Sequence, residues 1–171
     1  MKPFIVVTDA LVGIPPKIVT RDVVRAIILR EGRILLMYSE QDHMYGTPGG
    51  AMTLGESKLD TLYRELLEEI GATQVKIIEH LGGTEEIRES RSLYGAVIRV
   101  VSDYYHVDVL HFSESKLEEH EEEMGLVPVW IGLDEAIAKN EATIAGLGEQ
   151  KLSFYTTQTA VLKYMKSRFG L

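Results

Sequence analysis

Acidic side chains recur at close spacing near the middle of the chain. Glu65, Glu68 and Glu69 stand at positions i, i+3 and i+4, which places them on one face of a helix. Like charges one turn apart destabilise an isolated helix by roughly a few tenths of a kcal/mol per pair, but a hard cation between them reverses this. Mg²⁺ prefers carboxylate oxygens together with substrate phosphates. The cluster alone leaves two interpretations open: a solvated helix face, which is the usual one, and a metal site for phosphate chemistry.

The element that carries these glutamates is expected to be a helix over roughly 56–70. Gly71 is well placed to end it. Thr53 and Glu56 have the T-x-x-E spacing of a capping box, so Glu56 is expected to close the start of the helix. At about 100° per residue the glutamates should face away from an apolar stripe that packs on a sheet. The stripe consists of Leu59, Leu62, Tyr63, Leu66 and Ile70.

A longer pattern surrounds this helix. It runs Gly50, five residues, Glu56, seven residues, and then RELLEEIGA from Arg64 to Ala72. The pattern resembles the Nudix box: Gly, five of any residue, Glu, seven of any, Arg-Glu, an aliphatic residue, any, Glu-Glu, any, Gly and an aliphatic residue. Only Ala72 departs from it, in place of a bulky aliphatic residue. The chain is identified as a member of the Nudix (MutT-like) hydrolase family.

The resemblance implies a fold class. The Nudix fold is an α/β/α sandwich with a mixed β-sheet, in which the box forms a loop–helix–loop. We expect this domain over 21–171, with 1–20 as an N-terminal extension that adds strands or contacts a second copy. Apolar, β-branched runs predict the strands and amphipathic spacing the helices. Strands are expected at 23–29, 33–38, 73–81, 93–112 and 126–131, helices at 134–139 and 154–169, and loops at 39–55 and 140–152.

The resemblance also implies roles for the box residues. Glu68 and Glu69 would be metal ligands, and Glu65 would be a further ligand or the general base for the attacking water. Arg64 would pair with the box carboxylates and hold them in place. Glu56 would orient Arg64 or a metal-bound water.

Further site residues are expected outside the helix. Gly49 and Gly50 would let the backbone turn tightly and approach the ligand and the metal. An additional acid is expected before the strand at 126–131, and Glu122 and Glu123 are our choice because they lie closest to it. A solvated acidic loop remains the alternative. The candidates in that run are Glu118, Glu119, Glu121, Glu122 and Glu123.

Weaker candidates concern substrate binding. Arg25, Arg88 and Arg91 could clamp phosphates, because guanidinium groups suit bidentate contacts with anions. Tyr38 could stack on a base, although a tyrosine in the core or at its rim is more common. Surface or ion-paired arginines are the corresponding alternative.

These observations predict a Mg²⁺-dependent pyrophosphohydrolase, with Mn²⁺ as a possible substitute. It would cleave a phosphoanhydride bond in a nucleoside diphosphate linked to another moiety, by water attack on phosphorus. The expected substrate is a small nucleotide, a nucleotide sugar or a compound of the ADP-ribose type. The alternative is a catalytically silent Nudix-fold sensor of a nucleotide ligand. An isomerase on this fold would rely on cysteine, and the chain has none.

Composition narrows the partners. The net charge of −8 over 171 residues argues against binding long nucleic acids by phosphate neutralisation. No apolar run approaches the length of a membrane-spanning helix. The absence of cysteine excludes disulfides and thiolate zinc sites and suits a cytoplasmic protein. A homodimer remains open.

Overall fold

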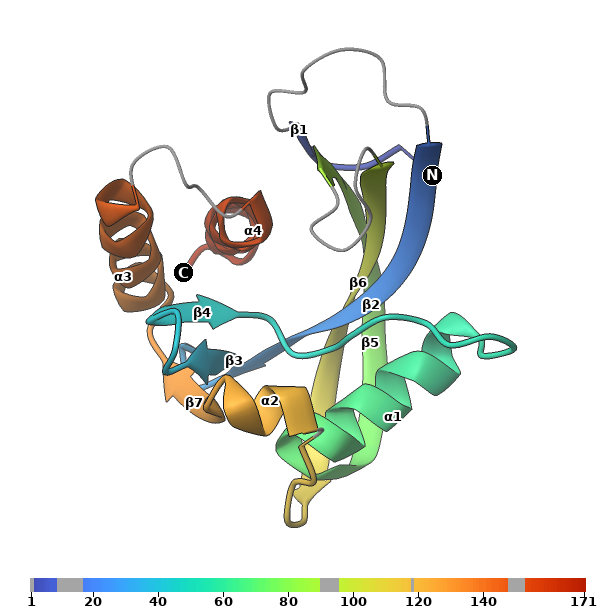
Figure 1. Cartoon of the computed structure of the whole chain (residues 1–171). Helices are drawn as coiled ribbons and strands as arrows, with labels where there is room; N and C mark the ends of the chain where they lie inside the picture. Colours follow the sequence, from blue (N-terminus) through green and yellow to red (C-terminus); the bar gives the residue numbers. More distant parts are fainter. Residues whose placement is uncertain (1, 9–16, 90–95, 118, 148–152) are drawn as a thin grey trace.

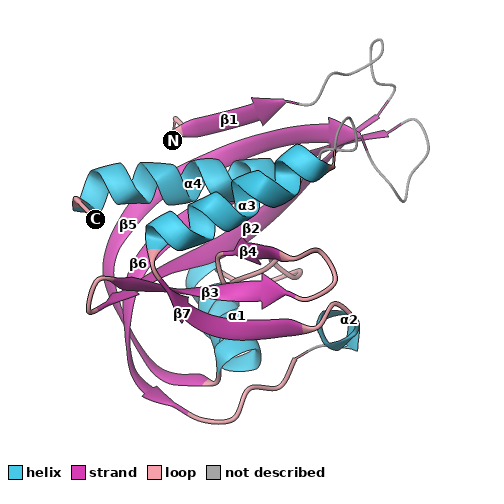
Figure 2. Ribbon diagram, turned by 90° about the vertical axis from the view of Figure 1, so that its left-hand side faces the viewer, coloured by secondary structure: helices cyan, strands magenta, loops and turns pink. Residues whose placement is uncertain are grey.

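A mixed β-sheet forms the centre of the molecule, as a computed structural model shows (Figure 1). The structure describes residues 2–8, 17–89, 96–117, 119–147 and 153–171. The strand order is β1-β5-β6-β2-β3-β4, and β7 pairs with β3. Helix α1 lies on one side of the sheet, while α3 and α4 lie on the other (Figures 1 and 2). The predicted Nudix-type α/β architecture is therefore confirmed.

The elements follow one another along the chain in the order β1-β2-β3-β4-α1-β5-β6-α2-β7-α3-α4. The strands are β1 (Ile5–Thr8), β2 (Lys17–Arg30), β3 (Arg33–Ser39), β4 (Met44–Gly46), β5 (Ala72–Glu89), β6 (Ala96–Phe112) and β7 (Leu126–Ile131). The helices are α1 (Lys58–Ile70), α2 (Glu119–Glu123), α3 (Leu133–Gly146) and α4 (Ser153–Phe169).

Strand β2 is the element on which both halves of the sheet meet. It runs parallel to β6 from residue 17 to residue 28 and pairs antiparallel with β3 only at its end. Side chains alternate between the two faces of a strand. Val24, Ala26 and Ile28 therefore enter the core beneath α1, while Ile27 enters the core beneath α3 and α4.

Two apolar cores hold the helices on the sheet. The α1-side core contains Leu62, Leu66 and Ile70, which recur every four residues along α1. The α4-side core contains Val161, Leu162 and Met165 of α4, all fully buried. Each buried aliphatic side chain contributes about 1.5–3 kcal/mol, so both helices are fixed by packing.

The hairpin predicted between β2 and β3 is confirmed. Glu31 and Gly32 both have positive φ (51° and 74°), the conformation of a tight two-residue turn.

Other segments differ from the sequence-based expectation. The expected loop at 39–55 contains β4, which pairs with β3. The acidic run, expected as a loop, contains the short helix α2. Helix α3 continues to Gly146, into a segment predicted as a loop.

The N-terminal extension contributes to the sheet. β1 pairs in parallel with β5, with Ile5 opposite Thr84. The ring of Phe4 stacks on Tyr164 of α4 at a centroid distance of 4.4 Å. The extension thus covers part of the β5 edge within its own chain, and a contact with a second copy stays a prediction. In the ranges that the structure describes, no helix is long and apolar enough to cross a bilayer.

The start of α1 differs from the predicted capping box. Ser57 is the N-cap: its hydroxyl accepts the Asp60 N–H at 3.2 Å, and the Asp60 carboxylate accepts the Ser57 N–H at 3.0 Å. Thr53 and Glu56 instead close the preceding turn through the Thr53 N–H and the Glu56 carboxylate, 3.1 Å apart. The prediction was wrong because the helix begins after this turn. Gly71 ends it at φ 66°, as predicted.

Replacing Ser57 with alanine should lower the free energy of unfolding by about 1 kcal/mol, because the first turn of α1 loses an acceptor for a backbone N–H. Thr53→Ala is the matched control and should cost less than half as much. Urea unfolding followed by circular dichroism measures both. The assignment of the cap is wrong if Thr53→Ala is the more destabilising variant.

Candidate active site

Helix α1 buries two glutamates on the flank of its apolar stripe. Glu65 and Glu69 are 8% and 5% exposed. Leu59 and Tyr63, predicted to be part of the apolar stripe, are 39% and 42% exposed. The buried arc of α1 is turned because residues 48–52 run along β2 and cover the flank that carries the glutamates. The prediction that the glutamates share a face turned away from the apolar stripe was therefore wrong for Glu65 and Glu69.

Two glycines allow this segment to approach α1. Gly49 has φ 122°, and a Cβ there would lie 2.2 Å from the carbonyl oxygen of Val24. A Cβ on Gly50 would lie 2.5 Å from the carboxylate of Glu65. The Gly49 N–H donates to Glu69 Oε2 at 2.5 Å. A side chain at Gly49 would therefore push the segment away from the backbone of β2, and one at Gly50 would push it away from the carboxylate of Glu65.

Arg64 organises the surrounding acids, as predicted. Its Nε donates to Glu56 Oε1 at 2.7 Å, and its Nη1 donates to Glu65 at 2.8 Å and to Glu68 at 3.0 Å. Its Nη2 reaches the carbonyl oxygen of Ala51 at 3.2 Å. One guanidinium thus joins the helix, its preceding turn and residues 47–52, which we call the glycine segment.

The carboxylates around Arg64 and Gly49 have opposite pKa shifts. Hydrogen bonding to Arg64 holds the pKa of Glu56 well below its usual range. Burial raises the pKa of Glu65, and Arg64 opposes this rise. Burial raises the pKa of Glu69 to about 8, against the opposing effects of Arg25 and the Gly49 N–H. Burial of Glu65 and Glu69 therefore favours their neutral forms when no cation lies beside them.

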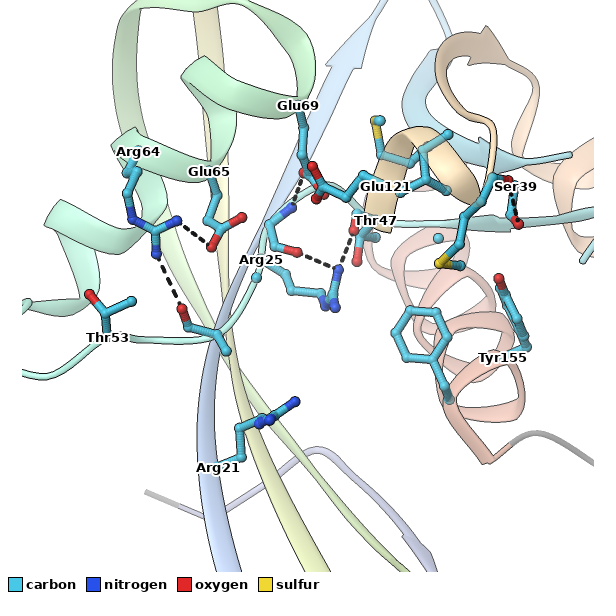
Figure 3. A pocket seen from close by; sticks show the side chains of 18 residues that line it. Arg21, Arg25, Ser39, Thr47, Thr53, Arg64, Glu65, Glu69, Glu121 and Tyr155 are labelled. Atoms are coloured by element: carbon cyan, nitrogen blue, oxygen red, sulfur yellow. Dashed lines mark hydrogen bonds and ion pairs between the residues drawn. The ribbon is translucent and has the colours of Figure 1, made fainter. Parts of the chain in front are cut away.

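A third carboxylate meets these two from α2. Glu121 is 7% exposed, and Glu65, Glu69 and Glu121 each offer an oxygen within 4.8 Å of the others. Figure 3 shows Glu69 and Glu121 pointing toward one another from separate helices. Such a set of hard oxygen donors suits Mg²⁺ or Mn²⁺ rather than a thiophilic metal. We call Glu65, Glu69 and Glu121 the acid cluster.

The structure does not bring every predicted ligand into the acid cluster. Glu122 and Glu123 are exposed, because α2 turns only one of these neighbours toward α1. The expectation that the acid nearest β7 would be the ligand assumed a loop. Glu68 lies beside the cluster and shares Nη1 of Arg64 with Glu65. Glu118 lies outside the described residues.

Arg25 supports the glycine segment from β2. Its Nη1 donates to the carbonyl oxygens of Thr47 and Gly49, at 2.6 and 2.8 Å. Its guanidinium carbon also lies 5.2 Å from the centre of the Phe154 ring, a cation–π distance. Arg25 therefore reaches the site, where it positions the backbone of Thr47 and Gly49.

Helix α4 anchors the same segment through Gln158, which the sequence did not indicate. Gln158 Oε1 accepts the N–H of Thr47 at 2.9 Å and its hydroxyl at 2.6 Å. Gln158 Nε2 lies 3.2 Å from the hydroxyl of Tyr104 on β6. All three side chains are buried, where an unpaired polar group costs about 1–3 kcal/mol. The segment that leads to the acid cluster is thus fixed from both β2 and α4.

A cavity of about 410 Å³ opens beside the acid cluster. Its walls come from β2, β3, the glycine segment, α1, α2 and α4 (Figure 3). Away from the acid cluster the lining combines polar side chains, among them Arg21 and Arg25, with an apolar and aromatic set: Met37, Met124, Leu126, Phe154 and Tyr155. The Tyr155 hydroxyl donates to Asp42 at 2.7 Å, which fixes the start of α4 against the β3–β4 turn.

The weaker substrate candidates do not line this cavity. Tyr38 bonds to His43 and packs on Tyr45, because strand alternation turns it away from the face that carries Met37 and Ser39. Arg88 pairs with Glu86 at 2.9 Å near the end of β5. The expectation that Tyr38 and Arg88 contact a substrate in this cavity was therefore wrong. Arg91 lies outside the described residues.

Comparison with known proteins places the chain in a family. The sequence profile of the NUDIX domain matches residues 19–149, the range that contains the box helix, the glycine segment and the acid cluster. The chain belongs to the NUDIX domain family. The predicted membership of the Nudix family is thereby confirmed. No curated protein matches the sequence.

Solved structures similar to this chain include a NUDIX hydrolase from Nitrosomonas europaea. It is 23% identical with a TM-score of 0.55, and the alignment covers 71% of this chain and 78% of the other. An ADP-ribose pyrophosphatase from Streptococcus suis is 23% identical with a TM-score of 0.48, covering 67% and 75%. A MutT NUDIX hydrolase from Burkholderia pseudomallei is 23% identical with a TM-score of 0.46, covering 67% and 84%. The first of these supports the Nudix fold.

Glu69→Gln, which replaces the buried carboxyl with a group that does not titrate, should change how the free energy of unfolding of the metal-free protein depends on pH. The folded pKa of about 8 exceeds the ordinary value of 4.5, so between these values only the folded state retains this proton. The free energy of unfolding should therefore fall as pH rises from 6 to 8, by about 2 kcal/mol. In Glu69→Gln this fall should be absent.

Urea unfolding in EDTA at pH 6, 7 and 8 measures the slope for each protein. Glu122→Gln is the matched control, because its side chain is exposed, and it should retain the slope of the wild type. Equal slopes for the wild type and Glu69→Gln would contradict the buried, protonated state of this carboxyl.

Proposed function

We propose that this protein is a Mg²⁺-dependent pyrophosphohydrolase that cleaves a phosphoanhydride bond in a nucleoside diphosphate linked to a second moiety. The observation that carries the proposal is the acid cluster at one end of the 410 Å³ cavity. Carboxylates within 4.8 Å of one another repel strongly once buried. A divalent cation turns this repulsion into attraction and gives the site affinity for phosphate.

The cavity favours a small substrate with a flat group. Its volume falls in the usual range of small-molecule sites, roughly 300–1,000 Å³. Phe154 and Tyr155, whose ring centres lie 4.9 Å apart, form an aromatic wall of the cavity, and Met37 and Met124 also line it. A nucleobase can pack against such a wall while its phosphates reach toward the acids. This arrangement supports a nucleotide-type diphosphate.

Glu65, Glu69 and Glu121 are the residues that would hold the ion. Glu68 is a further ligand for a second ion, because it already lies next to Glu65 on the same Arg64 nitrogen. When bound, Mg²⁺ supplies neutralisation of the phosphate oxygens and lowers the pKa of a water molecule. Arg64 neutralises part of the negative charge of these carboxylates. Its hydrogen bonds to Glu65 and Glu68 hold the two side chains in position.

The reaction requires a proton acceptor next to the attacking water. Glu65 and Glu121 are the candidates, because each faces the cavity and has a second carboxylate beside it. A carboxylate within hydrogen-bond reach takes the proton as the water attacks phosphorus. No covalent bond to the protein forms in this scheme. Glu56 and Gly49 act indirectly, since Glu56 orients Arg64 and Gly49 orients Glu69.

Glutamate-to-glutamine substitutions on α2 test the site. Glu121→Gln should lower kcat/KM at least about a hundredfold, because it removes a ligand charge worth several kcal/mol in the transition state. Glu122→Gln and Glu123→Gln are matched controls two residues or fewer away and should retain wild-type rates. The assay measures Mg²⁺-dependent release of nucleoside monophosphate from ADP-ribose, UDP-glucose and nucleoside triphosphates.

Metal removal provides a second test on the wild-type protein. EDTA should abolish turnover, and Mg²⁺ or Mn²⁺ should restore it, because without the ion nothing in the acid cluster neutralises the diphosphate or lowers the pKa of the attacking water. Turnover that persists in EDTA would contradict the proposal. Tight binding of a compound without turnover would instead favour the sensor function.

A further inference from the structure

The catalytic cavity continues into a second hollow at Arg21. Arg21 lines both the 410 Å³ cavity and an open groove of about 610 Å³. The groove runs between the first half of β2 and the turn before α1, residues 51–56. Because Arg21 and Arg25 are four residues apart on one strand, they share a face and their Cα atoms lie roughly 13 Å apart. Arg21 therefore marks the junction between the two hollows.

Arg21 differs from the other arginines of the cavity in its bonding. Arg25 donates to Thr47 and Gly49, and Arg64 donates to three glutamates. Within the described part of the chain, no hydrogen bond or ion pair joins Arg21 to another residue. Its guanidinium is exposed and keeps all of its donors for a ligand. It is thus the cavity arginine best able to bind an anion.

The position of Arg21 complements that of the acid cluster. Figure 3 shows Glu69 and Glu121 at one side of the cavity and Arg21 at the opposite side, with Arg25 between them. A diphosphate whose scissile part faces the metal-holding acids has anionic oxygens on its other side as well. A guanidinium there binds phosphate with bidentate geometry and without competing for the ion.

The groove beyond Arg21 has a mixed lining, in which an apolar set of side chains lies beside polar ones that include Asp22 and Glu56. Val19 and Ile98 are register partners on β2 and β6, so their side chains share one face of the sheet. Met52 and Leu54 face the groove from the turn before α1, and Leu54 is fully exposed. Together these four side chains offer apolar surface inside a hollow, the usual contact for the organic part of a ligand.

We propose that Arg21 binds a phosphate oxygen of the substrate, and that the arm of the substrate beyond this phosphate lies in the groove formed by Val19, Met52, Leu54 and Ile98. The inference rests on the proposed function and adds to it a second subsite. The nucleoside lies against the aromatic wall of α4, and the arm attached to the other phosphate follows β2 past Arg21. A substrate with an organic group on each phosphate fills both hollows.

Steady-state kinetics with ADP-ribose, or with UDP-glucose if it turns over faster, tests the role of Arg21. Arg21→Ala should raise KM about tenfold to a hundredfold and leave kcat nearly unchanged, because a charge-assisted hydrogen bond to bound substrate is lost. Arg21→Lys should recover part of the loss. Arg33→Ala, an exposed arginine at the β2–β3 turn that lines neither hollow, is the matched control and should retain the wild-type KM.

The groove is tested separately with Leu54→Ser, which has no folding cost because Leu54 is fully exposed. This variant should raise KM for the two-armed substrate a few fold. It should leave unchanged the inhibition constant of ADP, which ends at its second phosphate. Arg21→Ala should weaken both. Equal effects of Leu54→Ser on the substrate and on ADP would overturn the groove as the site of the second arm.

The outcomes separate this inference from the proposed function. If the wild type hydrolyses no compound, the proposed function fails, and binding of inorganic pyrophosphate with Mg²⁺, followed by calorimetry, decides the role of Arg21. Weaker binding by Arg21→Ala than by Arg33→Ala supports an anion site at Arg21. Equal KM values, or equal pyrophosphate affinities, for these two variants overturn it.

Discussion

The contact between the buried face of α1 and the glycine segment is the constraint on which the site depends. Glu65 and Glu69 are removed from water at a cost that only polar partners or a cation can offset. Gly49 provides one such partner, and a Cβ at Gly50 would collide with the other carboxylate. The part of the glycine segment that lies against these acids must therefore consist of backbone without side chains.

The rest of the fold holds that backbone in place. β2 supplies Arg25, which binds two carbonyl oxygens of the segment, and α4 supplies Gln158, which binds Thr47. The Gln158 contact joins elements far apart in the sequence, since Gln158 and Thr47 are separated by 111 positions. Phe154 and Tyr155, the aromatic residues that line the cavity, belong to the same helix as Gln158. Helix α4 therefore holds the glycine segment in place, and the glycine segment in turn positions the acid cluster.

The elements predicted from the sequence were those with a strong local signal. The box pattern identified α1 and the acids on it, and Glu31-Gly32 identified the β2–β3 hairpin. The phase of α2 was not predictable, because a helix of five residues offers too short a period to show that Glu121, rather than Glu122, faces inward.

Other misses have equally specific causes. Thr53 and Ser57 both begin plausible capping boxes, and only the packing of α1 decides between them. Tyr38 was assigned to the site by residue type, although alternation along β3 directs it to the other face. The four-residue spacing between Arg21 and Arg25 indicates that both side chains lie on one face of a strand. That Arg21 lines both hollows could be learned only from the structure.

The central claim is that a divalent cation binds among Glu65, Glu69 and Glu121. Anomalous diffraction from crystals grown with Mn²⁺ tests it most directly, because the ion is located without reference to activity. The account predicts a peak within coordination distance, about 2.0–2.4 Å, of oxygens from these carboxylates, and loss of that peak in Glu69→Gln. A fully occupied Mn²⁺ elsewhere on the chain, with none at the acid cluster, would contradict it.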